Sequence, residues 1–173
     1  MKRKASFLLI VLILFSACSI MPRRTIQILW PDNIQYIEAL CELDLMWKDT
    51  RYSGSMSLIL DYPNKLLIDV YGPFGDTVVH IKKDVEKFIM TTKEGSFYNE
   101  AQFESKFGIK LNEFINDLAR KNNNTKNDTN NDSNERNQYK VRYDLDNGNN
   151  KICWEIREGE ICITFLEAKF SKL

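Results

Sequence analysis

The sequence predicts an α+β protein, mainly antiparallel β: a strongly curved, half-barrel sheet of about nine strands, with two short helices as a lid over its apolar concave face. Three observations predict it. Apolar and polar residues alternate with a period of two through most of the chain, turn residues separate these runs, and one stretch of helical spacing interrupts them. A sheet of this width tends to curl, and amphipathic helices need an apolar surface to cover.

The first half of the chain carries the clearest alternation. From Ile37 to Trp47 the odd positions are apolar, whereas acidic residues occupy several even positions, a pattern typical of a strand with one buried face. Turn residues such as Pro63-Asn64 separate the alternating runs. The predicted strands of this half cover residues 37–47, 52–60, 66–70, 76–83, 85–92 and 96–98.

Helical spacing follows the sixth predicted strand. Asn99 is a candidate N-cap for the first helix, and Gly108 is a candidate end. Asn112 is a candidate cap for the second helix. Each helix is amphipathic, so each must lay an apolar face on another element. The lid residues that this spacing predicts are Phe103, Phe107, Leu111, Phe114, Ile115 and Leu118.

Three more strands are predicted after the helices. The hairpin signal Asn147-Gly148 separates the first of them from the second. Strand alternation then resumes with isoleucines and aromatic residues on one face. These strands cover residues 139–145, 152–156 and 161–165.

Two cysteines lie in the last predicted hairpin. A turn at Glu158-Gly159 puts Cys162 opposite Glu155, one pair away from Cys153. A disulfide needs Cβ atoms within about 4.5 Å of each other, and this offset does not offer that distance. A disulfide between Cys153 and Cys162 is possible in an oxidising periplasm, but we expect free thiols on a solvated or edge face.

The N-terminus has the anatomy of a lipoprotein signal peptide. Three basic residues precede a short apolar run that ends at Phe15, and the small residues Ser16 and Ala17 precede Cys18. The apolar run is shorter than the roughly 20 residues that span a bilayer. The end of this segment resembles a lipobox, which implies cleavage after residues 1–17 and lipid modification of Cys18.

The remaining chain is predicted to form one domain. Residues 18–35 are expected to be the lipidated N-terminus and a tether or irregular segment, and residues 36–173 the folded domain. Within the domain, residues 122–138 are almost wholly Asn, Asp, Lys, Thr and Ser. This segment is unable to bury apolar area, and we expect it to be a disordered loop.

Composition and motifs argue against several classes of function. Removing residues 1–17 takes three basic residues from a chain with 24 basic and 24 acidic ones, which leaves 21 against 24. No basic patch indicates a nucleic-acid partner. The single histidine, His80, has no motif partner, and no phosphate loop, metal-ligand spacing or nucleophile elbow is present. We expect no catalytic residue, no metal and no cofactor.

A family resemblance adds a specific expectation. The loop Gly72-Pro73-Phe74-Gly75 follows a strand, and a hairpin, a turn and two short helices come after it. This order from Tyr71 to Ala119 resembles the outer-membrane lipoprotein receptors of the Lol pathway (LolB-like), which share the LolA/LolB half-barrel. The strands before and after it also fall in the order of that family.

The resemblance implies a receptor for lipoproteins. Such a protein is a monomer, is anchored to the outer membrane by its lipid and faces the periplasm. It takes lipoprotein cargo from a periplasmic carrier (LolA-like), holds the acyl chains in an apolar cavity and inserts them into the outer membrane. The cavity lining that this implies consists of Leu43, Leu45, Trp47, Met56, Leu58, Leu60, Ile68, Val70, Trp154, Ile156, Ile163 and Phe165.

The resemblance also gives the loop at residues 72–75 a role. Its tip residue, Phe74, matches an exposed apolar residue that contacts the membrane during delivery. From the residues alone, Phe74 could instead fold back onto Tyr71 or Val78. Ordinary core packing explains the lining residues equally well. The alternative functions are a lipid-anchored scaffold with a packed interior, or a binder of a different lipid.

Overall fold

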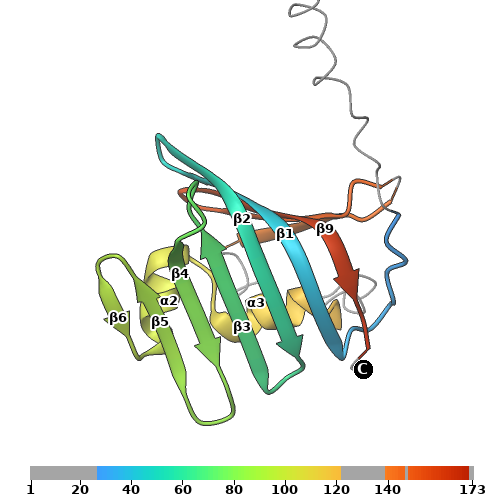
Figure 1. The fold of residues 1–173 in the computed structure, drawn as a ribbon, viewed down its shortest axis with the longest axis horizontal. Helices are drawn as coiled ribbons and strands as arrows, with labels where there is room; N and C mark the ends of the chain where they lie inside the picture. The colour runs from blue at the N-terminus through green and yellow to red at the C-terminus, as the bar shows by residue number, and fades with distance from the viewer. Residues whose placement is uncertain (1–26, 122–138, 147, 172–173) are drawn as a thin grey trace, which may run out of the picture.

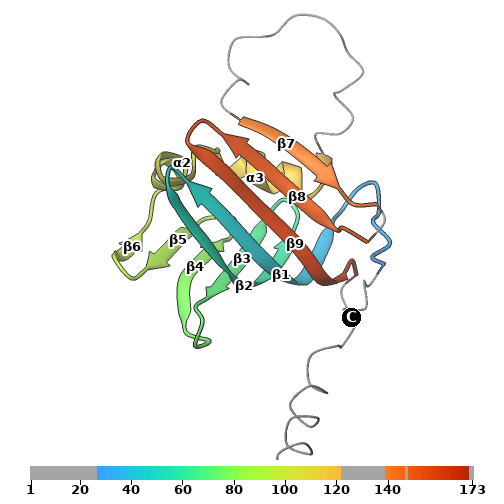
Figure 2. The same ribbon diagram turned by 90° about the horizontal axis from the view of Figure 1, so that it is seen from above.

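The computed structural model describes residues 27–121, 139–146 and 148–171. Nine strands in this part form one antiparallel sheet in the order β6-β5-β4-β3-β2-β1-β9-β8-β7, and the sheet is not closed into a barrel. Strands that are consecutive in the sequence pair with each other, except that β6 and β7 form the two edges of the sheet, and β9 joins the two halves by lying between β1 and β8 (Figures 1 and 2). The prediction of about nine antiparallel strands is therefore confirmed. The strands are β1 (Tyr36–Trp47), β2 (Thr50–Asp61), β3 (Lys65–Tyr71), β4 (Thr77–Lys83), β5 (Phe88–Thr92), β6 (Gly95–Phe97), β7 (Tyr139–Asp144), β8 (Lys151–Ile156) and β9 (Gly159–Lys169).

Two short helices, α2 (Glu100–Phe107) and α3 (Leu111–Leu118), interrupt the strands as predicted. The side chain of Asn99 accepts a hydrogen bond from the backbone N–H of Ala101 at 2.9 Å, and Gly108 ends α2 with a left-handed φ of 67°. The prediction that Asn112 caps the second helix is wrong. Asn112 lies inside α3, which begins after Lys110 without a side-chain cap.

Both helices lie on the same face of the sheet (Figures 1 and 2). In α2, the ring of Phe103 packs edge-on against Phe88 of β5, with centroids 6.3 Å apart. In α3, Phe114 packs against Trp154 of β8 at 4.8 Å. The helix pair therefore contacts strands from both halves of the sheet, since β5 and β8 each lie next to an edge strand.

The core lies between this face of the sheet and the helices. Alternate residues of β2, namely Met56, Leu58 and Leu60, are buried, as the period-two pattern predicts. They belong to one continuous cluster of apolar side chains that also includes the apolar face of α3. The first residue of this cluster in the described part of the chain is Ile28, and the last is Phe170.

Residues 27–35 form an irregular segment, as one of the two expectations had it, but they are not a free tether, because three of their side chains pack on the core. Ile28 and Ile34 are buried. The indole N–H of Trp30 donates a hydrogen bond to Asn150 at 3.1 Å, and its ring packs against Phe165 with centroids 4.9 Å apart. Three aliphatic residues and one Trp in an aperiodic stretch give no strand or helix pattern, so the spacing did not show which of them are buried.

The expectation that Cys153 and Cys162 are free thiols is wrong. These cysteines are directly opposite each other in β8 and β9, and they form a disulfide. Ile156 pairs with Gly159, so the turn consists of residues 157–158 and the register differs by two residues from the predicted one. Both cysteines are buried, although they lie on the face away from the helices.

Gly159 allows β1 and β9 to approach each other closely. This glycine opens β9 opposite Trp47 of β1, and a Cβ atom placed on it would lie 1.8 Å from the carbonyl oxygen of Met46. The backbones of β1 and β9 approach too closely there for any side chain. Gly159 therefore serves the strand contact rather than the turn.

We expect Gly159→Ala to lower the free energy of unfolding by about 1–3 kcal/mol or more, because the backbone must move to admit the methyl group. Urea denaturation with circular dichroism measures the loss. Gly75→Ala is the comparison, since Gly75 has a φ of 82° but open space around its Cβ position. That variant should lose about 1 kcal/mol. Equal losses in both variants would contradict the role given to the β1–β9 contact.

Candidate functional site

The predicted lining and lid residues lie in one apolar cluster beneath and within the helices. Most of the lining side chains are buried, and so are the lid residues apart from Phe107. Four members are only half-buried and pack against the cluster from one end of the sheet. These four are Leu43, Leu45, Trp47 and Phe107. The structure therefore brings the two predicted groups together, and in this conformation their side chains fill the space between sheet and helices.

Asp117 of α3 is a site residue that sequence reasoning missed. Its side chain is 1% exposed and accepts hydrogen bonds from the hydroxyl of Tyr139 at 2.9 Å and the indole N–H of Trp154 at 3.0 Å. The Tyr143 hydroxyl donates to the backbone carbonyl of Asp117 at 3.1 Å. Burial and the nearby Asp117 raise the pKa of both tyrosines well above the ordinary range. These hydrogen bonds join α3 to β7 and β8.

Asp117→Ala should lower the free energy of unfolding by about 2–4 kcal/mol, because the Tyr139 hydroxyl and the Trp154 N–H lose their acceptor in a buried place. Asp117→Asn keeps an oxygen acceptor and should lose less. Chemical denaturation of both variants tests this order. Asn112→Ala changes an exposed residue of the same helix and should be nearly neutral. An Asp117→Ala variant as stable as Asn112→Ala would show that these hydrogen bonds do not hold the helix.

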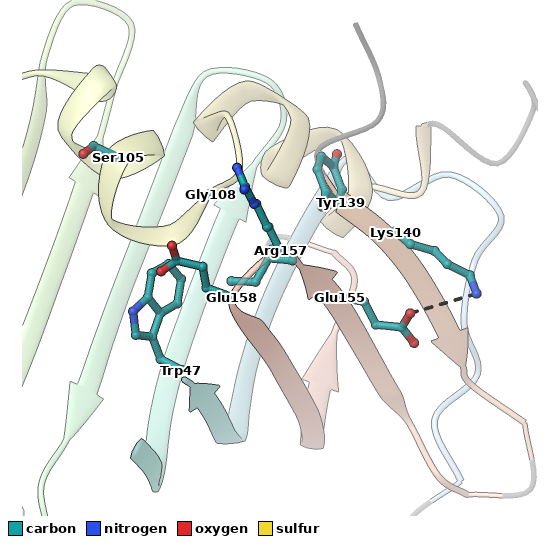
Figure 3. Close-up of a pocket in the computed structure, with 9 residues that line it drawn as sticks. Trp47, Ser105, Gly108, Tyr139, Lys140, Glu155, Arg157 and Glu158 are labelled. Carbon is teal, nitrogen blue, oxygen red and sulfur yellow. Dashed lines mark ion pairs between the residues drawn. The ribbon is translucent and has the colours of Figure 1, made fainter. Parts of the chain in front are cut away.

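An open groove of about 790 Å³ lies beside Trp47, one of the four half-buried side chains (Figure 3). Trp47 of β1, the C-terminal end of α2 and the β8–β9 turn form its sides, and β7 begins beside it. The groove combines apolar and charged groups. Its lining consists of Trp47, Ser105, Gly108, Tyr139, Lys140, Glu155, Ile156, Arg157 and Glu158.

The loop between β3 and β4 carries the most exposed large apolar side chain of the described residues. Phe74 is 97% exposed, so it does not fold back onto Tyr71 or Val78. The loop is closed by hydrogen bonds from the N–H of Gly72 to the carbonyl of Asp76 at 2.7 Å and from the N–H of Gly75 to the carbonyl of Gly72 at 3.0 Å. A defined turn therefore presents this ring to the surroundings.

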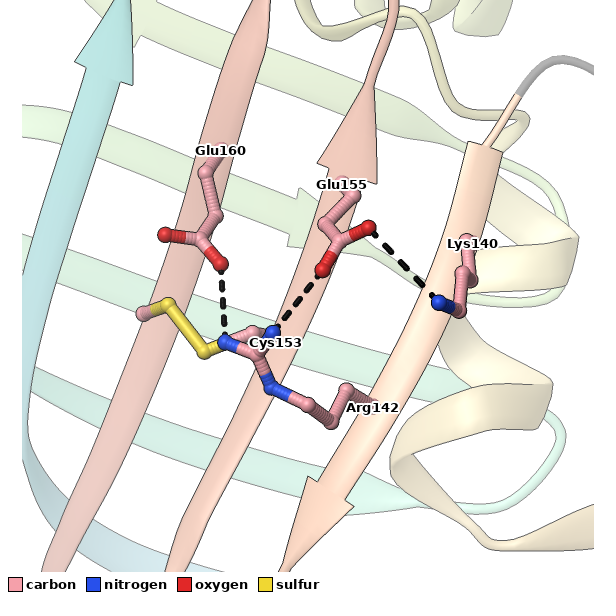
Figure 4. A network of polar contacts seen from close by, with 6 residues as sticks. Lys140, Arg142, Cys153, Glu155 and Glu160 are labelled. Atoms are coloured by element: carbon pink, nitrogen blue, oxygen red, sulfur yellow. Dashed lines mark hydrogen bonds and ion pairs between the residues drawn. A yellow bond between two sulfur atoms is a disulfide. The ribbon is translucent and has the colours of Figure 1, made fainter.

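The opposite face of the sheet is polar around the disulfide. Arg142 of β7 donates hydrogen bonds to Glu155 at 2.8 Å and to Glu160 at 3.0 Å (Figure 4). Glu160 and the two cysteine sulfurs lie within 4.8 Å of one another. Because the sulfurs are bonded to each other, they do not offer the thiolates that a metal ion requires. This cluster therefore covers the disulfide rather than forming a metal centre.

Two further groups lie apart from the groove. His80, which no motif pairs, has Nδ1 2.6 Å from a carboxylate oxygen of Asp69 on the polar face. Cys41 is a buried free thiol on the apolar face, and burial raises its pKa far above the ordinary value. A buried, protonated thiol is inert and behaves as a small apolar side chain.

The membrane anchor predicted at Cys18 lies outside the described residues, as do the signal peptide and the Asn-rich segment at 122–138. Neither described helix is long and apolar enough to cross a bilayer. Comparison of the chain with models of known protein families finds no match, and comparison with curated proteins finds no match either. The fold and the site therefore define a class only: an open antiparallel sheet with a two-helix cover over its apolar face.

Proposed function

We propose that this protein is an outer-membrane lipoprotein, anchored through Cys18 and facing the periplasm, that receives lipoproteins from a periplasmic carrier and inserts them into the membrane. The observation that carries the proposal is the apolar face shared by the sheet and the two helices, which is half-exposed at one end through Leu43, Leu45, Trp47 and Phe107. We further propose that the sheet is strongly curved around this face, as a half-barrel. The site is one of binding, with no catalytic role for His80.

The cargo defines what such a site must do. Each methylene of an acyl chain that leaves water contributes about 0.8 kcal/mol, so a carrier must shield the chains throughout transfer. Because the interior is filled in the described conformation, the chains enter by displacing apolar side chains of the helices. Chains and side chains have similar chemistry, so this exchange replaces one set of apolar contacts by another.

Phe74 supports the membrane half of the proposal. An exposed phenylalanine on a turn defined by glycines is available to enter the lipid headgroup region. Its transfer is worth about 1.5–3 kcal/mol at most. This energy assists delivery by a protein that a lipid already holds at the membrane.

The packed interior favours a second candidate, a lipid-anchored scaffold whose apolar face never opens. In that case the helices only complete the core, and a partner docks on another surface, such as the β7 edge of the sheet. Binding of acyl chains distinguishes the two candidates, since a scaffold binds none. A binder of another lipid is separated from a receptor by whether lipoproteins are transferred.

A transfer assay tests the receptor directly. The chain from Ser19 onward keeps every residue of the described core and is mixed with the host's carrier loaded with a lipoprotein. We expect the cargo to move onto this protein, and Leu45→Gln to slow the transfer at least about tenfold because it places an amide on the half-buried apolar face. Met46→Gln, on the opposite face of the same strand, should leave the rate unchanged.

Thermal melts of both variants establish that each is folded under the assay conditions. Cargo that stays on the carrier, together with no binding of fluorescent acyl-chain probes, would refute the proposal and favour the scaffold. Binding of acyl probes without lipoprotein transfer would instead indicate a carrier for a different lipid.

Phe74→Ala tests the membrane contact separately. We expect this variant to accept cargo normally but to release it into outer-membrane lipid vesicles about tenfold or more slowly, since up to about 3 kcal/mol of insertion is lost. Val85→Ala is the control, because Val85 is also an exposed apolar residue (77%) but lies in the β4–β5 loop. Identical release by the wild type and both variants would show that Phe74 does not contact the membrane.

A further inference from the structure

The groove at the end of α2 contains a charged side chain that the fold does not neutralise. The rim carries two acidic residues, and each already has a basic partner: Lys140 lies 4.0 Å from Glu155, and Lys48 lies 3.2 Å from Glu158. In the described part of the chain, no carboxylate lies within ion-pair distance of Arg157. Arg157 extends from the β8–β9 turn across the groove in the direction of Gly108 (Figure 3). Arg157 is exposed, so its guanidinium is accessible to an anionic ligand in the groove.

The same groove has an apolar side next to this charge. Trp47 and Ile156 line it and also belong to the apolar assembly under the helices. Gly108 lies so close to Ile156 that a Cβ on the glycine would be in van der Waals contact with it, at 3.8 Å. The groove therefore extends from the guanidinium of Arg157 to the apolar contact between α2 and the sheet. Its volume of about 790 Å³ is within the range of small-molecule sites, about 300–1,000 Å³.

The two helices differ in the polar contacts that attach them to the sheet, and α2 is the helix that lines the groove. Buried hydrogen bonds to Asp117 tie α3 to β7 and β8. The polar contacts of α2 are two ion pairs of partly exposed side chains. Glu100 of α2 pairs with Lys83 of β4, and Lys106 of α2 pairs with Glu94 in the β5–β6 turn. Exposed ion pairs contribute little, about 0–1 kcal/mol each. We therefore expect α2 to move away from the sheet more easily than α3 does.

We propose that this groove binds the acidic head of a single-chain amphiphile, a carboxylate or phosphate attached to an alkyl chain, with Arg157 as its partner. The planar guanidinium donates two parallel hydrogen bonds to either oxyanion. The alkyl chain then runs past Trp47 and Ile156 and under α2. This inference rests on the proposed binding of acyl chains, and it adds a second class of ligand besides the lipoprotein cargo, together with the place of its head.

Matched pairs of ligands test the proposal. Laurate and 1-dodecanol have the same chain length, but only laurate carries a charge, and dodecyl phosphate provides the second oxyanion. Binding of each to the chain from Ser19 onward is measured by titration calorimetry below the concentration at which micelles form. We expect laurate or dodecyl phosphate to bind about tenfold or more tightly than dodecanol, the usual effect of a hydrogen-bonded charge.

Arg157→Gln should abolish this preference and leave dodecanol binding unchanged. Arg51→Gln is the matched control, because Arg51 lies in the nearby β1–β2 hairpin but pairs with Asp44 at 3.5 Å. The oxyanion that loses more affinity in Arg157→Gln identifies the natural head as a carboxylate or a phosphate.

Two results would overturn the inference, and they differ in meaning. Equal affinity for laurate, dodecyl phosphate and dodecanol, or a preference that survives in Arg157→Gln, would show that Arg157 does not receive the head, while acyl-chain binding stands. No binding of any of the three ligands would remove the proposed acyl-chain site itself.

Discussion

The hydrogen bonds that Asp117 accepts from Tyr139 and Trp154 are the interaction on which the arrangement of the site depends. They fix one helix to the end of the sheet near β7, and the short link through Gly108 then places the other helix over β5. A buried carboxylate is costly unless donors surround it. The indole and the phenol meet that need, so the polar anchor also sets the position of the apolar face between the helices and the strands.

Local patterns were sufficient for most of the fold. Period-two alternation located β1, β2 and β3 because each has one buried face, and Asn99 and Gly108 marked the ends of α2 because caps act within a few residues. The lid and lining residues lie in or against one apolar cluster, whereas their role in binding acyl chains stays a prediction. The exposure of Phe74 followed from its place on a glycine turn, where the backbone offers nothing to pack on.

The features that spacing missed depend on contacts between distant parts of the chain. In the sequence, Gly159 has the character of a turn residue, whereas in the structure it pairs with Ile156 and lies against Met46 of β1. The register of β8 and β9 then pairs Cys153 with Cys162. An aspartate such as Asp117 has the same sequence context whether it is buried or solvated. The groove around Arg157 combines four segments, so no local motif describes it. Residues 27–35 likewise pack without any period.

The place of β9 in the sheet has a consequence for how the chain folds during synthesis. This last strand lies between β1 and β8, so the first strand keeps an unpaired edge until nearly the whole chain has been translated. Contacts so far apart in sequence raise the contact order and slow folding, because a long loop must close before they form. Until β9 pairs with it, the open edge of β1 presents unpaired backbone groups, and another strand can pair with them in its place.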